Sequence, residues 1–180
     1  MLIAFSGLAG SGKTTAARHL VEAHGFVRLR WAEPLKAMIK TLIEVEGESD
    51  RWIDGDYKEK IHPLLGCTPR HAMQTLGTEW GRKCINPDLW VHLTVNRIVY
   101  NLMLDRKVVM DDCRFDNEFT AIDRLKGQVI RLERPGLNTT STHESEKGCR
   151  FHQVFPNYGS PKDMQIALDD LISRMVERPS

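Results

Sequence analysis

The sequence has almost no net charge and no long apolar run, and both shortages exclude classes of protein. Lysine and arginine number 25 against 24 aspartate and glutamate residues, so the formal net charge is +1. This balance creates no overall field that would draw the chain onto a nucleic-acid polymer or an anionic membrane, and we expect neither as a partner. The apolar run at residues 1–5 is too short for a membrane span or a signal peptide. We therefore expect a cytoplasmic protein.

Cysteine is also scarce and widely spaced, which excludes a disulfide scaffold or a zinc finger. The four cysteines form no C-x-x-C pair and have no histidine at finger spacing. We expect reduced, mostly buried thiols. They are Cys67, Cys84, Cys113 and Cys149. With 41% hydrophobic and 27% charged residues over 180 positions, the chain is predicted to form one globular domain, residues 1–180.

Apolar periodicity alternates along the chain between short runs and helical patterns. Strands are expected at residues 2–5, 26–31, 107–112, 128–133 and 151–155. Helices are expected at residues 13–24, from Pro34 to Ile43, at 68–79, 86–104 and 116–126, and from Pro161 onward. Residues 44–56 show no clear period and are interpreted as a loop. This alternation predicts an α/β fold with three layers, in which helices cover both faces of a central, mostly parallel sheet.

A phosphate-binding loop lies between the first expected strand and the first expected helix. Residues 7–14 match the pattern G-x-x-x-x-G-K-[ST] in the strand and helix context that it requires. Glycines let backbone N–H groups point at phosphates, Lys13 reaches the β and γ oxygens, and Thr14 ligates Mg²⁺. The residues expected to bind ATP phosphates are Gly7, Ala9, Gly10, Ser11, Gly12, Lys13, Thr14 and Thr15.

The magnesium ion of such a site also needs a carboxylate at the end of a neighbouring buried strand. Asp111 and Asp112 follow the apolar run Val108-Val109-Met110. Asp112 is the expected ligand together with Thr14, with Asp111 as the alternative. An acidic residue can also simply end a strand.

Four groups of residues beyond the P-loop suggest which reaction the site performs. The chain has no Asn-Lys-x-Asp guanine motif, which favours a small-molecule kinase over a GTPase. Residues 31–36, 68–70, 74–82 and 88–91 resemble the phage-type deoxynucleoside monophosphate kinases. The resemblance extends to residues 112–115 and 117–118, to Arg134-Pro135, and to residues 143–146. It implies a nucleoside monophosphate kinase fold with a mobile lid, Mg²⁺, and transfer of the γ-phosphoryl of ATP to a deoxynucleoside 5′-monophosphate.

A monophosphate acceptor needs guanidinium groups for its phosphate and an aromatic or amide surface for its base. Arg70 is expected at the phosphate, and Gln74, one helical turn on, and Trp80, just past a helix end, near the base or sugar. Ordinary core packing is the alternative for Trp80 and is preferred for Trp90. The expected acceptor residues are Lys36, Arg70, Gln74, Trp80, Arg82, Asp88, Arg114 and Glu118.

Several of these residues also have simpler interpretations. Lys36 could be an ordinary solvated lysine. Asp88 and Glu118 each lie at a helix start, where a negative charge stabilises the helix without any ligand. The resemblance raises the chance that Glu118 orients Arg114. The acceptor-binding helical segment is expected to cover about residues 33–104.

A lid is expected at about residues 134–150, because this stretch is polar and has no apolar period. The resemblance places His143, Glu144, Ser145 and Glu146 in it. Asn157 and Gly159 lie where related kinases rest the adenine, although the same residues form plain turns.

Catalysis is expected to rest on positioning and charge neutralisation by Lys13, Arg114, Arg134 and Mg²⁺, because the acceptor phosphate is already mostly a dianion. The alternatives are a kinase for a modified nucleotide, a nucleotide within DNA or another small phosphorylated acceptor, or a non-catalytic nucleotide-binding switch. A homodimer is compatible with the sequence.

Overall fold

The chain is described by a computed structural model for residues 1–44, 49–137 and 148–177, and these form two compact units. Unit 1 comprises Met1–Arg30 and Asn96–Ser180, and unit 2 comprises Trp31–Val95. No helix within the described ranges is both long and apolar enough to cross a membrane.

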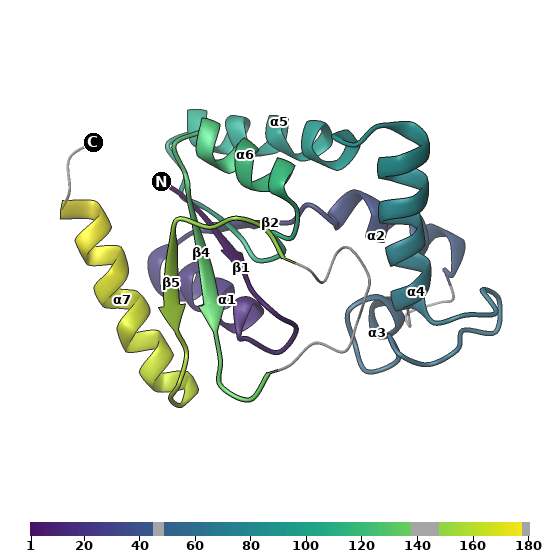
Figure 1. Ribbon diagram of the computed structural model, residues 1–180, viewed down its shortest axis with the longest axis horizontal. Coiled ribbons are helices and arrows are strands. Elements are labelled where there is room, and N and C mark those ends of the chain that lie inside the picture. Colours follow the sequence, from purple (N-terminus) through teal and green to yellow (C-terminus); the bar gives the residue numbers. More distant parts are fainter. Residues whose placement is uncertain (45–48, 138–147, 178–180) are drawn as a thin grey trace. The chain divides into compact units, whose positions relative to one another are not determined.

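Unit 1 is built on a five-stranded, entirely parallel sheet, which confirms the predicted α/β fold (Figure 1). The order of the strands is β2-β3-β1-β4-β5, so the chain's first strand lies at the centre. All four strand pairs join elements that are distant in sequence, as parallel pairing through helical crossovers requires. The strands are β1 (Leu2–Ser6), β2 (Val27–Leu29), β3 (Val108–Met110), β4 (Gln128–Glu133) and β5 (Gln153–Pro156).

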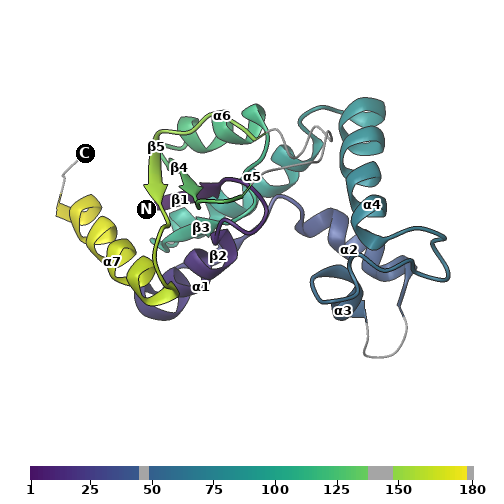
Figure 2. The same cartoon turned by 60° about the horizontal axis from the view of Figure 1, so that its bottom comes forward.

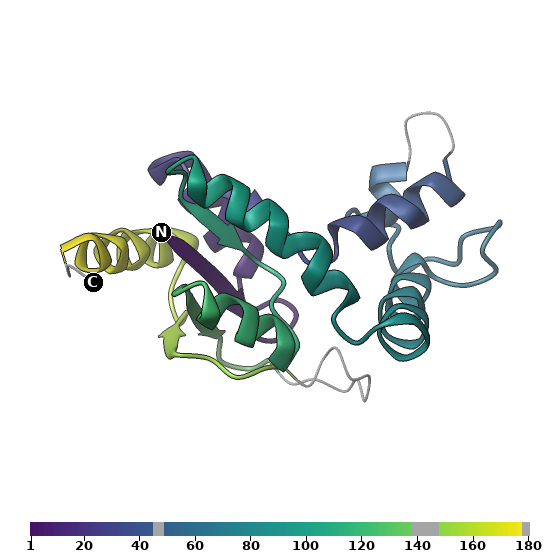
Figure 3. The ribbon, with the colours of Figure 1, turned by 90° about the horizontal axis from the view of Figure 1, so that it is seen from above.

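Helices cover both faces of this sheet. Helices α1 (Lys13–His24) and α7 (Pro161–Glu177) bury Leu20 and Leu168 together with Phe5 of β1 in one apolar core. Helix α6 (Asp116–Arg124) lies on the opposite face with Ile122 fully buried (Figure 2). Helix α7 lies beside the edge strand β5 (Figure 3). The three-layer arrangement follows from burying one apolar stripe of each helix.

Unit 2 is helical, and its core gathers around Trp90. Its elements are α2 (Glu33–Leu42), α3 (Ser49–Ile53), α4 (Pro69–Gln74), η1 (Thr75–Ile85) and the first residues of α5 (Leu89–Met103), which continues into unit 1. The prediction of a loop at residues 44–56 is wrong over Ser49–Ile53. Ile53 is buried against Leu35 and Ile39, and this packing favours a short helix where the sequence has no period of its own.

The helix expected at residues 68–79 continues to Ile85, because η1 follows α4 as a π-helix. Gly77 and Gly81 explain the local geometry. The indole Nε1 of Trp90 donates a hydrogen bond to the Gly77 carbonyl at 2.7 Å, and a Cβ at Gly81 would lie 2.5 Å from the same indole. Because Gly77 and Gly81 have no side chains, the indole of Trp90 can pack directly against the helix backbone. Trp80 consequently lies within a helix and not past its end, which corrects the prediction, and the core role preferred for Trp90 is confirmed.

The thiols are free, as predicted, but the expectation that most are buried is wrong. Only Cys113 is buried, whereas Cys84 is exposed. Cys113 Sγ lies 3.6 Å from Cys149 Sγ, although the two residues are 36 positions apart. The hydrogen bond between the two thiols and burial raise the pKa of the Cys113 thiol well above its ordinary value, so the neutral thiol is the stable form there.

Candidate active site

The P-loop connects the central strand β1 to α1, and its backbone depends on glycine. Gly7, Gly10 and Gly12 have φ angles of 125°, 80° and 101°, which L side chains rarely adopt. At Gly7 a Cβ would also lie 2.5 Å from the carbonyl oxygen of Leu132 in the neighbouring strand β4. The loop therefore turns back tightly over the end of the sheet before the helix begins at Lys13.

Lys13 folds its side chain over its own loop. Its Nζ donates hydrogen bonds to the carbonyl oxygens of Gly7 and Leu8, both at 2.7 Å. The ammonium group is thus held at the loop, beside the first turn of α1, where unpaired backbone N–H groups already attract anions. A phosphate oxygen that entered the loop would meet this ammonium without a large movement of the lysine.

Asp111, at the end of β3, faces the start of α1. Its Oδ2 accepts a hydrogen bond from the Thr14 hydroxyl at 2.9 Å, and its side chain is only 4% exposed. Asp112 is the next residue and is half-buried. Of the two candidate carboxylates, the structure brings Asp111 against Thr14, and the contact joins residues 97 positions apart.

Two arginines that the sequence analysis did not single out hold Asp111 in place. Arg28 of β2 binds both of its oxygens, with Nε 3.1 Å from Oδ1, and Arg30 Nε lies 3.5 Å from Oδ1. Burial raises the pKa of Asp111, but the hydrogen bond and charge of Arg28, the charge of Arg30 and the Thr14 hydroxyl lower it below its ordinary value. The carboxyl is therefore ionised. The available sequence signal was two arginines two positions apart, at residues 28 and 30, one within a short expected strand and one near its end.

Glu118 fixes the backbone beside Arg114. Its carboxylate is 2% exposed and accepts hydrogen bonds from the backbone N–H groups of Arg114 at 2.7 Å and Phe115 at 3.1 Å. The same bonds cap the N-terminus of α6. Glu118 therefore stabilises the start of the helix and at the same time fixes the backbone of Arg114. Arg134, just after β4, is exposed.

Asn157 lies behind the P-loop, where it supports the loop backbone. Its side-chain amide donates a hydrogen bond to the Ser11 carbonyl at 2.9 Å, and the side chain is buried. The Asn157 nitrogen would be 2.7 Å from a Cβ at Gly12, which is a second reason for glycine there. Gly159 follows in the connection to α7 and packs against Asp163.

In unit 2, two of the cationic acceptor candidates form ion pairs with carboxylates. Arg70 forms an ion pair with Glu59, and Lys36 Nζ lies 2.5 Å from Asp54 Oδ1. Arg70 and Glu59 are 34% and 61% exposed, so water competes for this pair. Gln74 lies one turn beyond Arg70 and is half-buried.

The remaining acceptor candidates in unit 2 surround the end of η1. Arg82 donates a hydrogen bond to the carbonyl oxygen of Pro87 at 3.0 Å. The backbone N–H of Asp88 donates to the Asn86 side chain at 2.7 Å, which fixes the turn before α5. Trp80 is 41% exposed, whereas Trp90 is buried.

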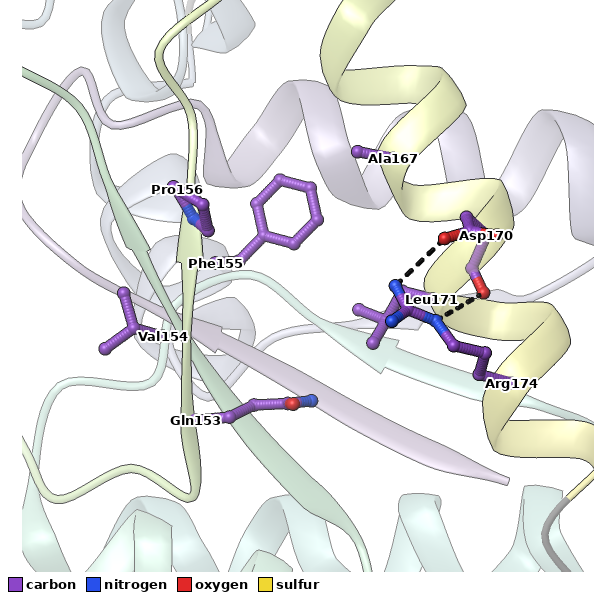
Figure 4. A pocket seen from close by; sticks show the side chains of 8 residues that line it. All are labelled: Gln153, Val154, Phe155, Pro156, Ala167, Asp170, Leu171 and Arg174. Carbon is purple, nitrogen blue, oxygen red and sulfur yellow. Dashed lines mark hydrogen bonds and ion pairs between the residues drawn. The ribbon is translucent and has the colours of Figure 1, made fainter.

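The predicted lid residues His143, Glu144, Ser145 and Glu146 lie outside the described part of the chain. A pocket of about 320 Å³ lies between β5 and α7 (Figure 4). Its walls include Phe155, Asp170 and Arg174, and they contain none of the predicted site residues. The candidate active site is therefore not this pocket.

A P-loop at the end of a central parallel strand, facing an aspartate at the end of the neighbouring strand, is the arrangement of P-loop nucleotide-binding proteins. Two solved structures agree with this class. A shikimate kinase from Aquifex aeolicus has a TM-score of 0.56 at 11% identity over 98% of this chain and 99% of that one. A dephospho-CoA kinase from Campylobacter jejuni has a TM-score of 0.53 at 13% identity over 97% and 96%.

The sequence comparisons narrow the class to one family. The profile of the deoxynucleotide monophosphate kinases matches residues 66–166. A protein of Acanthamoeba polyphaga mimivirus, named for the same activity, is 37% identical over 162 residues, which cover 83% of this chain and 82% of that protein. The chain belongs to the deoxynucleotide monophosphate kinase family, and its function is that of a nucleoside monophosphate kinase.

Proposed function

We propose that the protein transfers the γ-phosphoryl of ATP to a deoxynucleoside 5′-monophosphate and releases ADP and the deoxynucleoside diphosphate. The observation that carries the proposal is the contact between Thr14 and an ionised, arginine-held Asp111 beside the P-loop, in a chain of this family. These residues supply an anion site and a cation site next to one another, which a nucleoside triphosphate with its metal ion requires.

The donor site is formed by residues of unit 1. Lys13 exchanges its bonds to the loop carbonyls for bonds to the β and γ oxygens. The Thr14 hydroxyl and the Asp111 carboxylate fit Mg²⁺, because both offer the oxygen ligands that this ion prefers. We assign Asp111 this role in place of Asp112, because Asp111 contacts Thr14. The ion, when bound, neutralises charge on the triphosphate.

Transfer itself requires no strong base on the protein. The second pKa of a phosphate monoester is about 6, so the acceptor is already mostly a dianion near neutral pH. Arg114 and Arg134 stabilise the equatorial oxygens of the transferred group as its charge spreads. Glu118 acts as a positioning residue, since it fixes the backbone that carries Arg114. The lid at about residues 134–150 excludes water that would otherwise hydrolyse ATP.

The acceptor site is formed within the segment of about residues 33–104, and one domain carries both substrates. Arg70 and Arg82 bind the acceptor phosphate, assisted by Lys36, after their present partners are displaced. Gln74 and Trp80 bind the base or sugar, with Asp88 nearby in sequence. The adenine of ATP rests on the connection at Gly159, while Asn157 supports the P-loop beneath it.

The deciding experiment is a panel of acceptors. The purified protein is incubated with ATP, Mg²⁺ and each common nucleoside or deoxynucleoside monophosphate, and ADP formation is followed. We expect ADP formation to depend on a deoxynucleoside monophosphate and to be weaker with its ribose counterpart. Turnover only with modified monophosphates would support the kinase activity but show that the acceptor is a modified nucleotide. If the rate of ADP formation were the same with and without each acceptor, the proposal would be contradicted and a nucleotide-dependent switch favoured.

A further inference from the structure

Three side chains from two helices of unit 1 converge at one point away from the P-loop. The Nε2 atoms of His19 and His24, both on α1, lie 2.6 and 2.7 Å from the same oxygen of Asp169 on α7. The two imidazole nitrogens and a carboxylate oxygen all lie within 4.8 Å of one another. The two rings meet edge to face, with centroids 5.8 Å apart.

The cluster is sheltered on the histidine side and open on the carboxylate side. The side chains of His19 and His24 are 12% and 22% exposed, whereas that of Asp169 is 49% exposed. The hydrogen bonds from both imidazoles lower the pKa of Asp169, so the carboxylate is ionised near neutral pH. The next residue, Asp170, has a different environment, because it faces the pocket at β5 and pairs with Arg174 at 3.0 Å (Figure 4).

We propose that His19, His24 and Asp169 form a binding site for a divalent transition-metal ion, with Zn²⁺ as the ion that fits best. Two neutral imidazoles and one carboxylate are common zinc ligands, and the open side leaves the fourth tetrahedral position to water. Zinc binds such ligands at about 2.0–2.2 Å, which sets neighbouring ligand atoms about 3.3 Å apart. The two imidazole nitrogens and the carboxylate oxygen, now within 4.8 Å of one another, therefore have to rearrange by about 1 Å each to surround an ion, and each imidazole then carries its proton on Nδ1.

The site would join α1 to α7 and would not take part in phosphoryl transfer. At 1.5 Å per residue, His19 and His24 lie about 9 and 16 Å along α1 from Lys13. A zinc ion there fixes the C-terminal helix against the far half of the P-loop helix. The expected role is stabilisation of unit 1, and this inference does not depend on which nucleotide is phosphorylated.

The test uses the full chain after treatment with a chelator and without nucleotide. Zn²⁺ is titrated in competition with a chromogenic chelator, and thermal unfolding is followed with and without the ion. We expect one ion per chain and a melting temperature about 5–10 °C higher at a Zn²⁺ concentration 100-fold above Kd. In His19→Gln, His24→Gln and Asp169→Asn the affinity should fall at least about 10-fold, and the rise in melting temperature at the same Zn²⁺ concentration should be about half as large or smaller.

Two matched variants separate this site from other zinc binding. Asp170→Asn alters the neighbouring carboxylate of α7, and His152→Gln alters the histidine that pairs with Asp123 at 3.1 Å. Both should bind zinc as the unaltered protein does. Asparagine at 169 keeps an oxygen that accepts hydrogen bonds, so this variant should fold and retain kinase activity. Zinc affinity in His19→Gln and His24→Gln equal to that of the unaltered protein would overturn the proposal. Binding lost only in Cys149→Ser, or the absence of tight binding, would overturn it as well.

Discussion

The P-loop region of unit 1 and the acceptor segment of unit 2 hold their charged residues in opposite ways. Around the P-loop, the charged side chains are held by hydrogen bonds that are partly or fully shielded from water: Lys13 binds the loop carbonyls, and Asp111 binds Thr14 and Arg28. In the acceptor segment, Arg70 and Lys36 pair with carboxylates that are about half exposed. The strands and helices of unit 1 hold the P-loop side chains in place. In the acceptor segment, a ligand can easily replace the exposed carboxylates as partners of Arg70 and Lys36.

This difference accords with what each region is proposed to bind. The donor is a triphosphate of constant structure, and a rigid site can be prepared for it in advance. The acceptor has to enter and leave in each turnover, and the cations that receive it are held meanwhile only by solvent-screened pairs. The comparison predicts that substitutions in the network around Asp111 affect turnover and stability together, whereas substitutions of the acceptor-binding residues affect chiefly the KM for the acceptor.

The largest effect is expected from Lys13→Ala. The variant loses the ammonium that neutralises the transferred phosphoryl group, and kcat should fall by about 10²-fold or more. Thermal unfolding should be nearly unchanged, because the lysine makes hydrogen bonds only partly shielded from water. Arg18→Ala, an exposed residue of the same helix, is the matched control and should keep full activity. Activity retained by Lys13→Ala would rule out this P-loop as the donor site.

Arg28→Gln tests the buried network that holds Asp111. Loss of the charged hydrogen bonds should lower the unfolding free energy by about 2–3 kcal/mol and reduce kcat about 10-fold, with a higher Mg²⁺ requirement. The folded-state pKa of Asp111 lies below its ordinary value near 3.8, so the stabilisation is present above about pH 4 and is lost as the pH falls through the folded pKa.

Denaturant titrations across this pH range provide the measurement for Arg28→Gln. The difference between the unaltered protein and the variant should shrink below pH 4, as Asp111 becomes protonated. The exposed Arg124→Gln on α6 serves as the control, with no pH-dependent difference. A difference that stays constant down to pH 2 would show that Arg28 acts through packing and not through the ionised Asp111.

The two tryptophans around η1 test whether packing and ligand contact are separate in unit 2. Trp90→Phe removes the hydrogen bond to Gly77 and part of a buried ring, and should lower the unfolding free energy by about 1–3 kcal/mol. Trp80→Phe, at a 41% exposed position, should change stability by less than about 0.5 kcal/mol but raise the KM for the acceptor. Equal losses of stability in both variants would contradict the assignment of Trp80 to the ligand.

The parts of the fold that the sequence could predict are those with local signals. The P-loop spacing fixes the backbone from Gly7 to Thr14, and alternating apolar runs gave the parallel sheet. The contact of Arg28 with Asp111 could not be predicted in the same way, since it joins residues 83 positions apart. The π-helix depends on the indole of Trp90 reaching Gly77 from another element. Helix propensity alone could predict neither this continuation nor α3.

The smallest effects are expected from two lysines of α2 that form similar ion pairs. Lys36 pairs with Asp54 and Lys40 with Asp50, at 2.5 and 2.9 Å, and both partner carboxylates are substantially exposed. Replacement of either lysine by alanine should therefore change stability little, because water and salt screen both pairs. Only Lys36→Ala should raise the KM for the acceptor, by about 10-fold, with the KM for ATP unchanged.

Initial rates at varied acceptor and fixed ATP distinguish the two lysine variants. The pairs are similar in chemistry and lie one helical turn apart, so a difference in KM would have to come from the bound acceptor and not from the helix. If both variants raised the KM equally, the effect would come from the total positive charge of α2, and the assignment of Lys36 to the phosphate would be wrong. If neither did, the acceptor would be held by Arg70 and Arg82 without help from this helix.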